Sequence, residues 1–206
     1  MRQLKAQITF HRYRHAATVL VCLLALLPLP IQAERYLTPA EAQKLCFPEA
    51  DRFEQKLVRY TPAQMAAIEK MSGVKVRNPV TKFWVALQDT NVLGVVVLDF
   101  VLGKHEFIDY AAAISLNGSV RQIEILEYRE SHGGQIRGKK WREQFKGKST
   151  QNPLKLHEDI YNISGATISC RHVTEGVRRL LAAYQVALRD LLPAAGRVPD
   201  AAPAAP

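Results

Sequence analysis

The sequence has few cysteines and lacks the cysteine patterns of several redox and metal-binding folds. Among its 206 residues there are three cysteines, and none are spaced as C-x-x-C or C-x-x-C-H. Zinc ribbons, thioredoxin-like domains and c-type haem attachment therefore lack support. In an exported chain, Cys46 and Cys170 either form one disulfide or stay as two separate buried thiols, and their spacing leaves both possibilities open.

The first 33 residues contain no acidic residue, and their pattern is that of an export signal. Four basic residues precede an apolar run from Ala16 to Leu27, and the small residue Ala33 closes the segment. We therefore expect residues 1–33 to be a cleaved signal peptide, with the protein in the periplasm or on the outer face of the cytoplasmic membrane. The alternative is an uncleaved anchor, because Ala16–Ala33 is near the short limit for crossing a bilayer.

The chain also lacks a strongly one-sided charge once this segment is removed. Its formal charge is +9, and without the four basic residues of the signal it is +5. The remaining basic residues are spread out, with short clusters at 139–142 and 178–179. In an exported protein this pattern indicates a solvated surface, or attraction to anionic lipid or an acidic partner, and argues against nucleic acid as a partner.

Two short helices are expected before the central strands. Thr38 and Thr61 are each followed by proline at a first helical position, and Glu41 completes a capping box after Thr38. Gly73 is the expected end of the second helix. Residues 52–60, between the two helices, alternate as a strand does.

The centre of the chain has strand patterns at 82–88, 92–102, 106–116 and 119–128. Asn117-Gly118, between the last two strands, is a strong hairpin signal. The last strand alternates apolar and polar residues with one slip, which predicts one buried and one exposed face. Its apolar positions are Val120, Ile123, Ile125 and Tyr128.

An amphipathic helix is predicted from about His172 to Leu188, and residues 191–206 have the composition of a disordered tail. The order of elements predicts an α+β fold over residues 34–190, with an antiparallel twisted sheet flanked by helices. The chain shows no internal repeat.

Two segments carry the candidate chemistry, although neither has a residue pair typical of a general acid and base. Ser164-Gly165-Ala166-Thr167 lies at the entrance of the last helix, where unpaired N–H groups suit a phosphate. Its hydroxyl residues are also ordinary helix caps. Upstream, Glu130 to Gly134 precede Trp141 and Phe145, which lie four residues apart and share one face of a helical turn. That segment also fits a surface turn whose two aromatic side chains pack onto the core.

Together, the two segments resemble the FMN-binding domain of the flavoprotein subunits of the Rnf complex and of the sodium-translocating NADH:quinone reductase, which also occurs in free-standing exported proteins. That family has the pattern E-[ST]-x-G, then a tryptophan and F-x-G, then D-x-x-[ST]-G-A-T. The matching residues here are Glu130-Ser131-His132-Gly133, Trp141, Phe145-Lys146-Gly147 and Ser164-Gly165-Ala166-Thr167. The resemblance extends over about residues 95–188.

The resemblance implies that an FAD-dependent flavin transferase joins FMN through its phosphate to the hydroxyl of Thr167. It implies an electron carrier with membrane or periplasmic redox partners rather than an enzyme with its own small substrate. Ser164 and Ser169 are expected to donate hydrogen bonds to the phosphate oxygens. The implied cofactor-binding residues are Glu130, Ser131, His132, Gly133, Gly134, Ser164, Gly165, Ala166, Thr167, Ile168 and Ser169.

The chain departs from the family pattern at one position. Tyr161 stands where the family usually has an aspartate, and the nearest carboxylate, Asp159, is two positions away. Normal attachment, weak attachment and non-covalent FMN therefore all stay open. Two other functions also stay open, a flavin reductase or redox sensor with His132 as proton donor, and a binding module without flavin.

Overall fold

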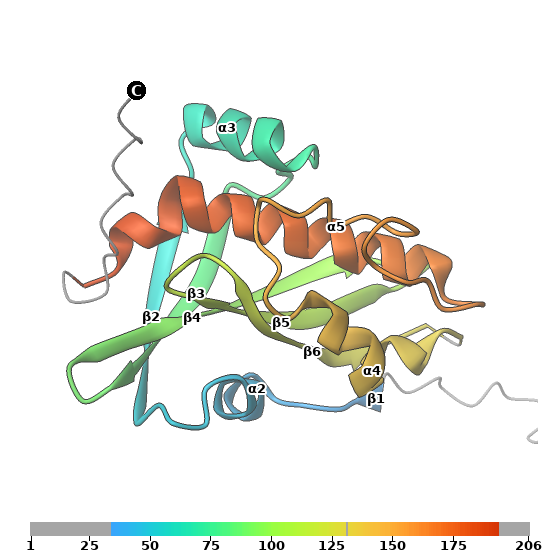
Figure 1. Cartoon of the computed structure of the whole chain (residues 1–206), viewed down its shortest axis with the longest axis horizontal. Helices are drawn as coiled ribbons and strands as arrows, with labels where there is room; N and C mark the ends of the chain where they lie inside the picture. The colour runs from blue at the N-terminus through green and yellow to red at the C-terminus, as the bar shows by residue number, and fades with distance from the viewer. Residues whose placement is uncertain (1–33, 131, 194–206) are drawn as a thin grey trace, which may run out of the picture. The chain divides into compact units, whose positions relative to one another are not determined.

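The structure is a computed structural model that describes residues 34–130 and 132–193. All six strands form one antiparallel, twisted sheet in the order β1-β6-β5-β4-β3-β2 (Figure 1). The α+β prediction is confirmed. The elements are β1 (Glu34–Arg35), α2 (Pro39–Cys46), β2 (Arg52–Arg59), α3 (Pro62–Ser72), β3 (Val80–Gln88), β4 (Asn91–Leu102), β5 (Phe107–Ser115), β6 (Val120–Tyr128), α4 (Lys139–Arg142) and α5 (Thr167–Ala183), with short 3-10 turns at Gly134–Arg137, Glu143–Phe145 and Arg189–Leu191 and a π turn at Tyr184–Leu188.

The predicted signal peptide, residues 1–33, lies outside the described residues, as does most of the predicted tail. Leu192, within that predicted tail, is still buried, with 2% of its surface exposed. Among the residues described, no helix is long and apolar enough to cross a membrane.

Helix α5 covers one face of the sheet, with α3 packed against α5 on that side, and α2 covers the other face (Figure 1). The larger core lies under α3 and α5 and includes Phe83 and Cys170, while the smaller core lies under α2 and includes Phe47 and Cys46. The two cysteines are therefore separate, fully buried free thiols on opposite faces of the sheet. Burial, followed by the nearby charge of Glu124, raises the pKa of Cys46 from 9.0 to about 12.

The predicted helix starts are confirmed by their caps. Thr38 Oγ1 accepts a hydrogen bond from the N–H of Glu41 at 3.3 Å, and the Glu41 carboxylate accepts one from the N–H of Thr38 at 2.7 Å. Thr61 and Gln64 form the same reciprocal pair at the start of α3. Gly73 ends α3 in a left-handed conformation, with φ of 66°.

Strand β6 is buried on both faces, so the prediction that one of its faces is exposed is wrong. Its outward side chains meet α2 and α4, which cover the sheet there; Leu126 packs in the smaller core and Glu124 pairs with Arg142. The slip in its alternation is a pair of β-bulges. The register with β5 shifts twice, which leaves Arg121 and Leu126 as the extra residues. The four apolar positions predicted to face inward, Val120, Ile123, Ile125 and Tyr128, all lie in the larger core.

Helix α5 begins at Thr167, about five residues before its predicted start near His172. The apolar periodicity begins only at Val173, and the first turns of the helix are polar or small apart from the exposed Ile168. Thr167 is consequently the first residue of the helix rather than part of a loop before it. The predicted apolar positions, Val173, Val177, Leu180, Leu181, Tyr184 and Leu188, are all buried.

The outer edge of β6 is covered along its length. Strand β1 pairs with its last residues. The Arg142 side chain donates to the carbonyl of Ile123 at 2.8 Å. At the start of the strand, Val120 exchanges two backbone hydrogen bonds of 2.7 Å with the segment 147–148. The segment from α4 to Lys148 is thereby attached to the sheet directly.

Candidate functional site

The two segments singled out in the sequence line one open cavity of about 640 Å³. This volume is in the range of roughly 300–1,000 Å³ that is usual for small-molecule and cofactor sites. Half of the residues in its wall are glycines, so backbone rather than side chains forms much of the surface. The lining residues are His132, Gly133, Gly134, Gln135, Arg137, Gly138, Ser164 and Gly165.

Gly133 brings the two segments into contact. It has a φ of 92°, and a Cβ at this position would lie 2.5 Å from the Tyr128 hydroxyl and 3.1 Å from the Ala166 Cβ. Only glycine fits such a close approach at this backbone conformation. The Tyr128 hydroxyl also donates to the carbonyl of His132 at 2.5 Å and lies 3.1 Å from the Ser169 hydroxyl. Ser169 therefore faces the core, at 5% exposure, and does not line the cavity.

Thr167 begins α5 two residues after Gly165 and is partly exposed. The preceding residue, Ala166, has no side chain that caps the helix, so the first backbone N–H groups lack a side-chain acceptor. These N–H groups and the positive end of the helix dipole favour an anion at this point. The Thr167 Oγ1 accepts a hydrogen bond of 2.8 Å from the Asn162 side-chain amide.

Ser164, Gly165 and Ile168 complete the exposed rim before and after Thr167. Ser164 and Gly165 are exposed and line the cavity, and Ile168 is 42% exposed. Gly165 has a φ of 82°, and a Cβ on it would meet no atom within 4 Å. Space is therefore open on the outer side of the turn that leads into Thr167.

Glu130 is directed to a different part of the structure from the cavity. Its Oε1 accepts hydrogen bonds from the backbone N–H groups of His105 at 2.6 Å and Glu106 at 3.0 Å. Burial acts to raise the pKa of Glu130, but these backbone hydrogen bonds outweigh it and the pKa is lowered. Glu130 thus fixes the turn between β4 and β5. Its neighbour Ser131 lies outside the described residues.

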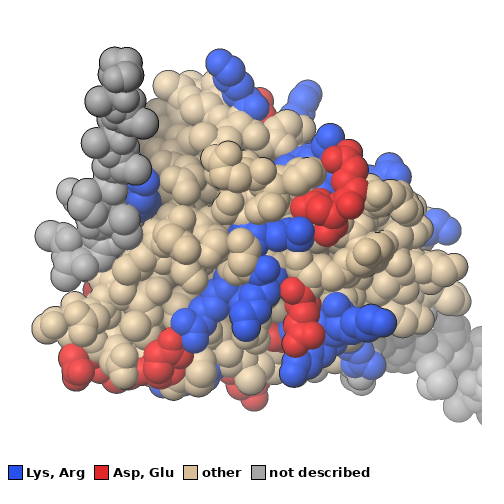
Figure 2. Space-filling view, in the orientation of Figure 1, with Lys and Arg blue, Asp and Glu red and all other residues tan. Residues whose placement is uncertain are grey.

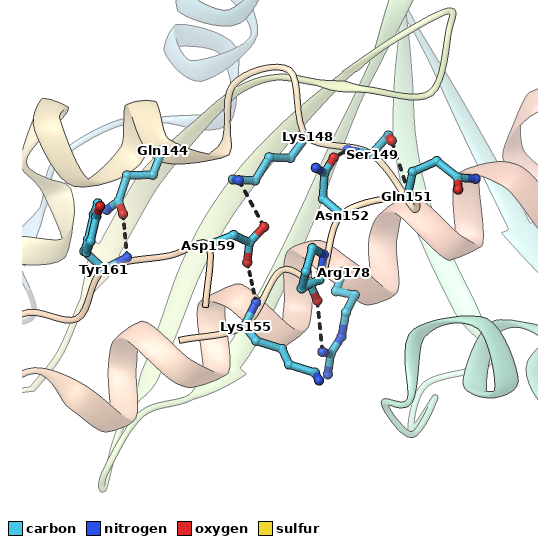
Figure 3. Close-up of polar contacts among 10 residues, drawn as sticks. Gln144, Lys148, Ser149, Gln151, Asn152, Lys155, Asp159, Tyr161 and Arg178 are labelled. Carbon is cyan, nitrogen blue, oxygen red and sulfur yellow. Dashed lines mark hydrogen bonds and ion pairs between the residues drawn. The ribbon is translucent and has the colours of Figure 1, made fainter. Parts of the chain in front are cut away.

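Trp141 and Phe145 share one face, as predicted, and pack on the core. Their rings meet edge to face with centroids 5.1 Å apart, and both are buried. The Trp141 Nε1 donates to the carbonyl of Tyr161 at 3.0 Å. The Gln144 side chain accepts from the Tyr161 N–H at 2.6 Å (Figure 3). The upstream aromatic segment therefore holds the backbone just before Asn162. The Tyr161 side chain itself is 80% exposed.

Asp159 is engaged in the loop before the site. One carboxylate oxygen accepts from Lys148 Nζ at 3.0 Å, and the other accepts from the Lys155 N–H at 2.9 Å (Figure 3). Burial alone would raise its pKa, but these hydrogen bonds and the Lys148 charge lower it. Asp159 therefore stabilises the conformation of this loop.

Comparison with known families identifies the domain in which the cavity lies. Residues 103–182 match the family model described as the FMN-binding domain. The match contains β5, β6, the glycine-rich cavity wall and α5 as far as Ala182. The chain contains an FMN-binding domain. Its cofactor is FMN.

Two further comparisons concern curated proteins and solved structures. No curated protein matches the chain. Among solved structures, it is similar to the crystal structure of NqrC from Shewanella oneidensis, with 16% sequence identity and a TM-score of 0.49. That similarity covers 72% of this chain and 87% of the NqrC chain.

The residues around the cavity fit FMN. Glycines give a flat ligand close access to the backbone, and the uncapped N–H groups of α5 suit its phosphate. The buried side-chain oxygen of Asn162 has no hydrogen-bond partner among the described residues. An unpaired buried acceptor is costly, so a donor from a bound molecule would stabilise it.

Three residues of the FMN-binding domain were missed by sequence reasoning, namely Gln135, Arg137 and Asn162. Gln135 and Arg137 line the cavity, and the Arg137 guanidinium lies 4.4 Å from the centre of the Tyr36 ring. Their only signal was proximity to Gly133-Gly134. Asn162 stands in a variable position of the motif and carried no signal.

The basic cluster at 139–142, which follows the cavity residue Gly138, is partly paired with acidic residues. Figure 2 shows Lys and Arg interleaved with Asp and Glu on the face that it draws. In the basic cluster at 139–142, Lys139 pairs with Glu143 at 3.6 Å and Arg142 with the buried Glu124. This part of the basic excess is therefore balanced locally.

Proposed function

We propose that this chain is an exported flavoprotein that carries FMN as a phosphoester on Thr167 and transfers electrons. The observation that supports attachment is the position of Thr167, a partly exposed residue that begins α5 two residues after Gly165, which lines the open, glycine-rich cavity. The sequence motif around it is the second support.

The attachment reaction uses FAD and a flavin transferase as partner. Thr167 Oγ1 forms a bond to the FMN phosphorus of FAD, the pyrophosphate bond of FAD breaks, AMP leaves, and the hydroxyl proton passes to solvent. The chain's contribution is to present the hydroxyl and to stabilise the phosphodiester anion with the N–H groups at the start of α5. Arg171, one helical turn after Thr167, adds a positive charge on the same side of the helix.

Bound FMN supplies the redox chemistry, since it accepts and releases one or two electrons. The open cavity favours exchange with a redox partner over the sequestered pocket of an enzyme with its own substrate. We propose membrane or periplasmic redox proteins as partners, in keeping with the predicted export signal.

Intact mass spectrometry of the chain produced with a flavin transferase tests the attachment. We expect an added mass equal to FMN less water in the wild-type chain and in Thr167→Ser, and none in Thr167→Ala. Yellow colour that is lost on denaturation would instead indicate non-covalent FMN. The same sample, taken from the periplasm, tests export, because cleavage at Ala33 predicts a mass that begins at Glu34.

A further inference from the structure

The motif position where the family usually has aspartate is filled by Tyr161, and among the described residues no carboxylate bonds to the Thr167 hydroxyl in its place. The Tyr161 side chain is 80% exposed, and both oxygens of Asp159 are engaged by Lys148 and Lys155. Neither residue has a hydrogen bond to the acceptor hydroxyl. The side chain that contacts the Thr167 Oγ1 is Asn162, at 2.8 Å.

From these contacts we infer that Asn162 is the positioning residue for flavin attachment, an inference that rests on the proposed function. A neutral amide, rather than a carboxylate, holds the acceptor oxygen in this chain. Because the amide N–H takes one lone pair of Oγ1, the threonine side chain is fixed and its remaining lone pair and hydrogen face other directions.

Asn162 is itself fixed from both sides. The N–H of the preceding residue, Tyr161, is held by Gln144 (Figure 3), and its carbonyl is held by Trp141. On the other side, the carbonyl of Ile163 accepts from the N–H of Ala166 at 3.0 Å. A side chain between two anchored backbone segments loses little entropy when it orders the hydroxyl.

An amide suits both the free and the modified threonine. A hydroxyl both donates and accepts, whereas the oxygen of a phosphoester only accepts. The hydrogen bond from Asn162 to Oγ1 needs no hydrogen from Thr167, so it persists after attachment. A carboxylate at 162 would instead repel the new phosphodiester anion. The unpaired oxygen of Asn162 remains available to accept a hydrogen bond from a hydroxyl of the flavin's ribityl chain or from water.

The test measures the rate of mass gain of the full chain with flavin transferase and FAD, for wild type, Asn162→Ala, Asn162→Ser and Asn162→Asp. Asn152→Ala is the matched control, because Asn152 accepts a hydrogen bond from the Ser149 N–H in the same loop and does not contact Thr167 (Figure 3). Thermal unfolding and non-covalent FMN binding in a Thr167→Ala background report whether each variant keeps its fold and cavity.

We expect Asn162→Ala to be about threefold to tenfold slower than wild type, the size of one neutral hydrogen bond, with Asn162→Ser partly restored and Asn152→Ala unchanged. Asn162→Asp should gain flavin slowly at neutral pH. Its rate should approach that of wild type as the pH falls toward the ordinary carboxyl pKa of about 4, because the protonated side chain is a neutral hydrogen-bond donor. Equal rates for wild type and Asn162→Ala, or an Asn162→Asp rate that rises with pH relative to wild type, would overturn the positioning role alone. A wild-type chain that gains no mass would overturn the proposed attachment together with it.

Discussion

Replacing Gly133 by alanine should destabilise the protein strongly, because this glycine joins the two segments of the site. Alanine at a φ of 92° costs about 1–2 kcal/mol in a left-handed conformation. Its Cβ would lie 2.5 Å from the Tyr128 hydroxyl and 3.1 Å from the Ala166 Cβ, and such overpacking costs about 1–3 kcal/mol more. The loss in the free energy of unfolding should therefore be about 2–5 kcal/mol.

Two nearby glycines provide matched controls for urea unfolding. Gly165 also has a positive φ, of 82°, but a Cβ on it meets open space, so Gly165→Ala should cost only the conformational part, about 1–2 kcal/mol. Gly134 has neither feature, since its nearest neighbours lie 3.9 Å or more from a Cβ, and Gly134→Ala should change stability by less than about 1 kcal/mol. If Gly133→Ala and Gly165→Ala were equally stable, the close contact between the segments would be refuted.

Three further predictions concern the thiols, the turn after β4 and the aromatic segment. Because the pKa of Cys46 is raised to about 12, the folded thiol stays protonated while the unfolded thiol ionises above pH 9. The free energy of unfolding should therefore fall between pH 9 and 12, with a shallower slope in Cys46→Ala. Cys46 and Cys170 should also resist thiol reagents at pH 8.5 until the protein unfolds. Glu130→Gln should lower the free energy of unfolding by about 1.5 kcal/mol at pH 7, measured with urea, and by less below pH 4. The lowered pKa of Glu130 gives stability that is present above the pKa of the unfolded carboxyl and is lost as the pH falls through the pKa of the folded carboxyl. The same loss at both pH values would contradict this. Trp141→Phe removes the hydrogen bond to the Tyr161 carbonyl, so it should lower the free energy of unfolding by about 1 kcal/mol and slow flavin attachment. Normal attachment at reduced stability would show that this hydrogen bond does not support attachment.

Local sequence signals predicted most elements of the fold, since their causes lie within a few residues. The Thr-Pro caps gave the starts of α2 and α3, and Asn117-Gly118 gave the hairpin, where Gly118 has a φ of 79°. The start of α5 was placed late because its first turns are held by the core through small residues such as Ser169 and Cys170, which carry no periodic apolar signal. The burial of the outer face of β6 depends on α2 and α4, which only the tertiary fold brings there.

The site was predictable where a motif exists and not where only a contact exists. Gly133, Ser164, Gly165 and Thr167 follow from the two family segments, and in the structure the first three of them line one cavity. Ser169 and Glu130 are part of the same segments but do not line the cavity. The Ser169 hydroxyl lies against Tyr128 in the core, and the Glu130 carboxylate bonds to the β4–β5 turn. Asn162 becomes visible only when its distance to Thr167 is known.

The cover over the outer edge of β6 has a consequence for self-association. An unpaired strand edge offers N–H and C=O groups to the edge of another copy, which is a common route to aggregation. Here the segment from Arg142 to Lys148 occupies that edge while its neighbour Trp141 holds the backbone before Asn162 and Thr167. Damage to this one segment would therefore disturb the proposed flavin site and expose the strand edge at the same time, so we expect poorly modified chains and aggregating chains to be the same molecules.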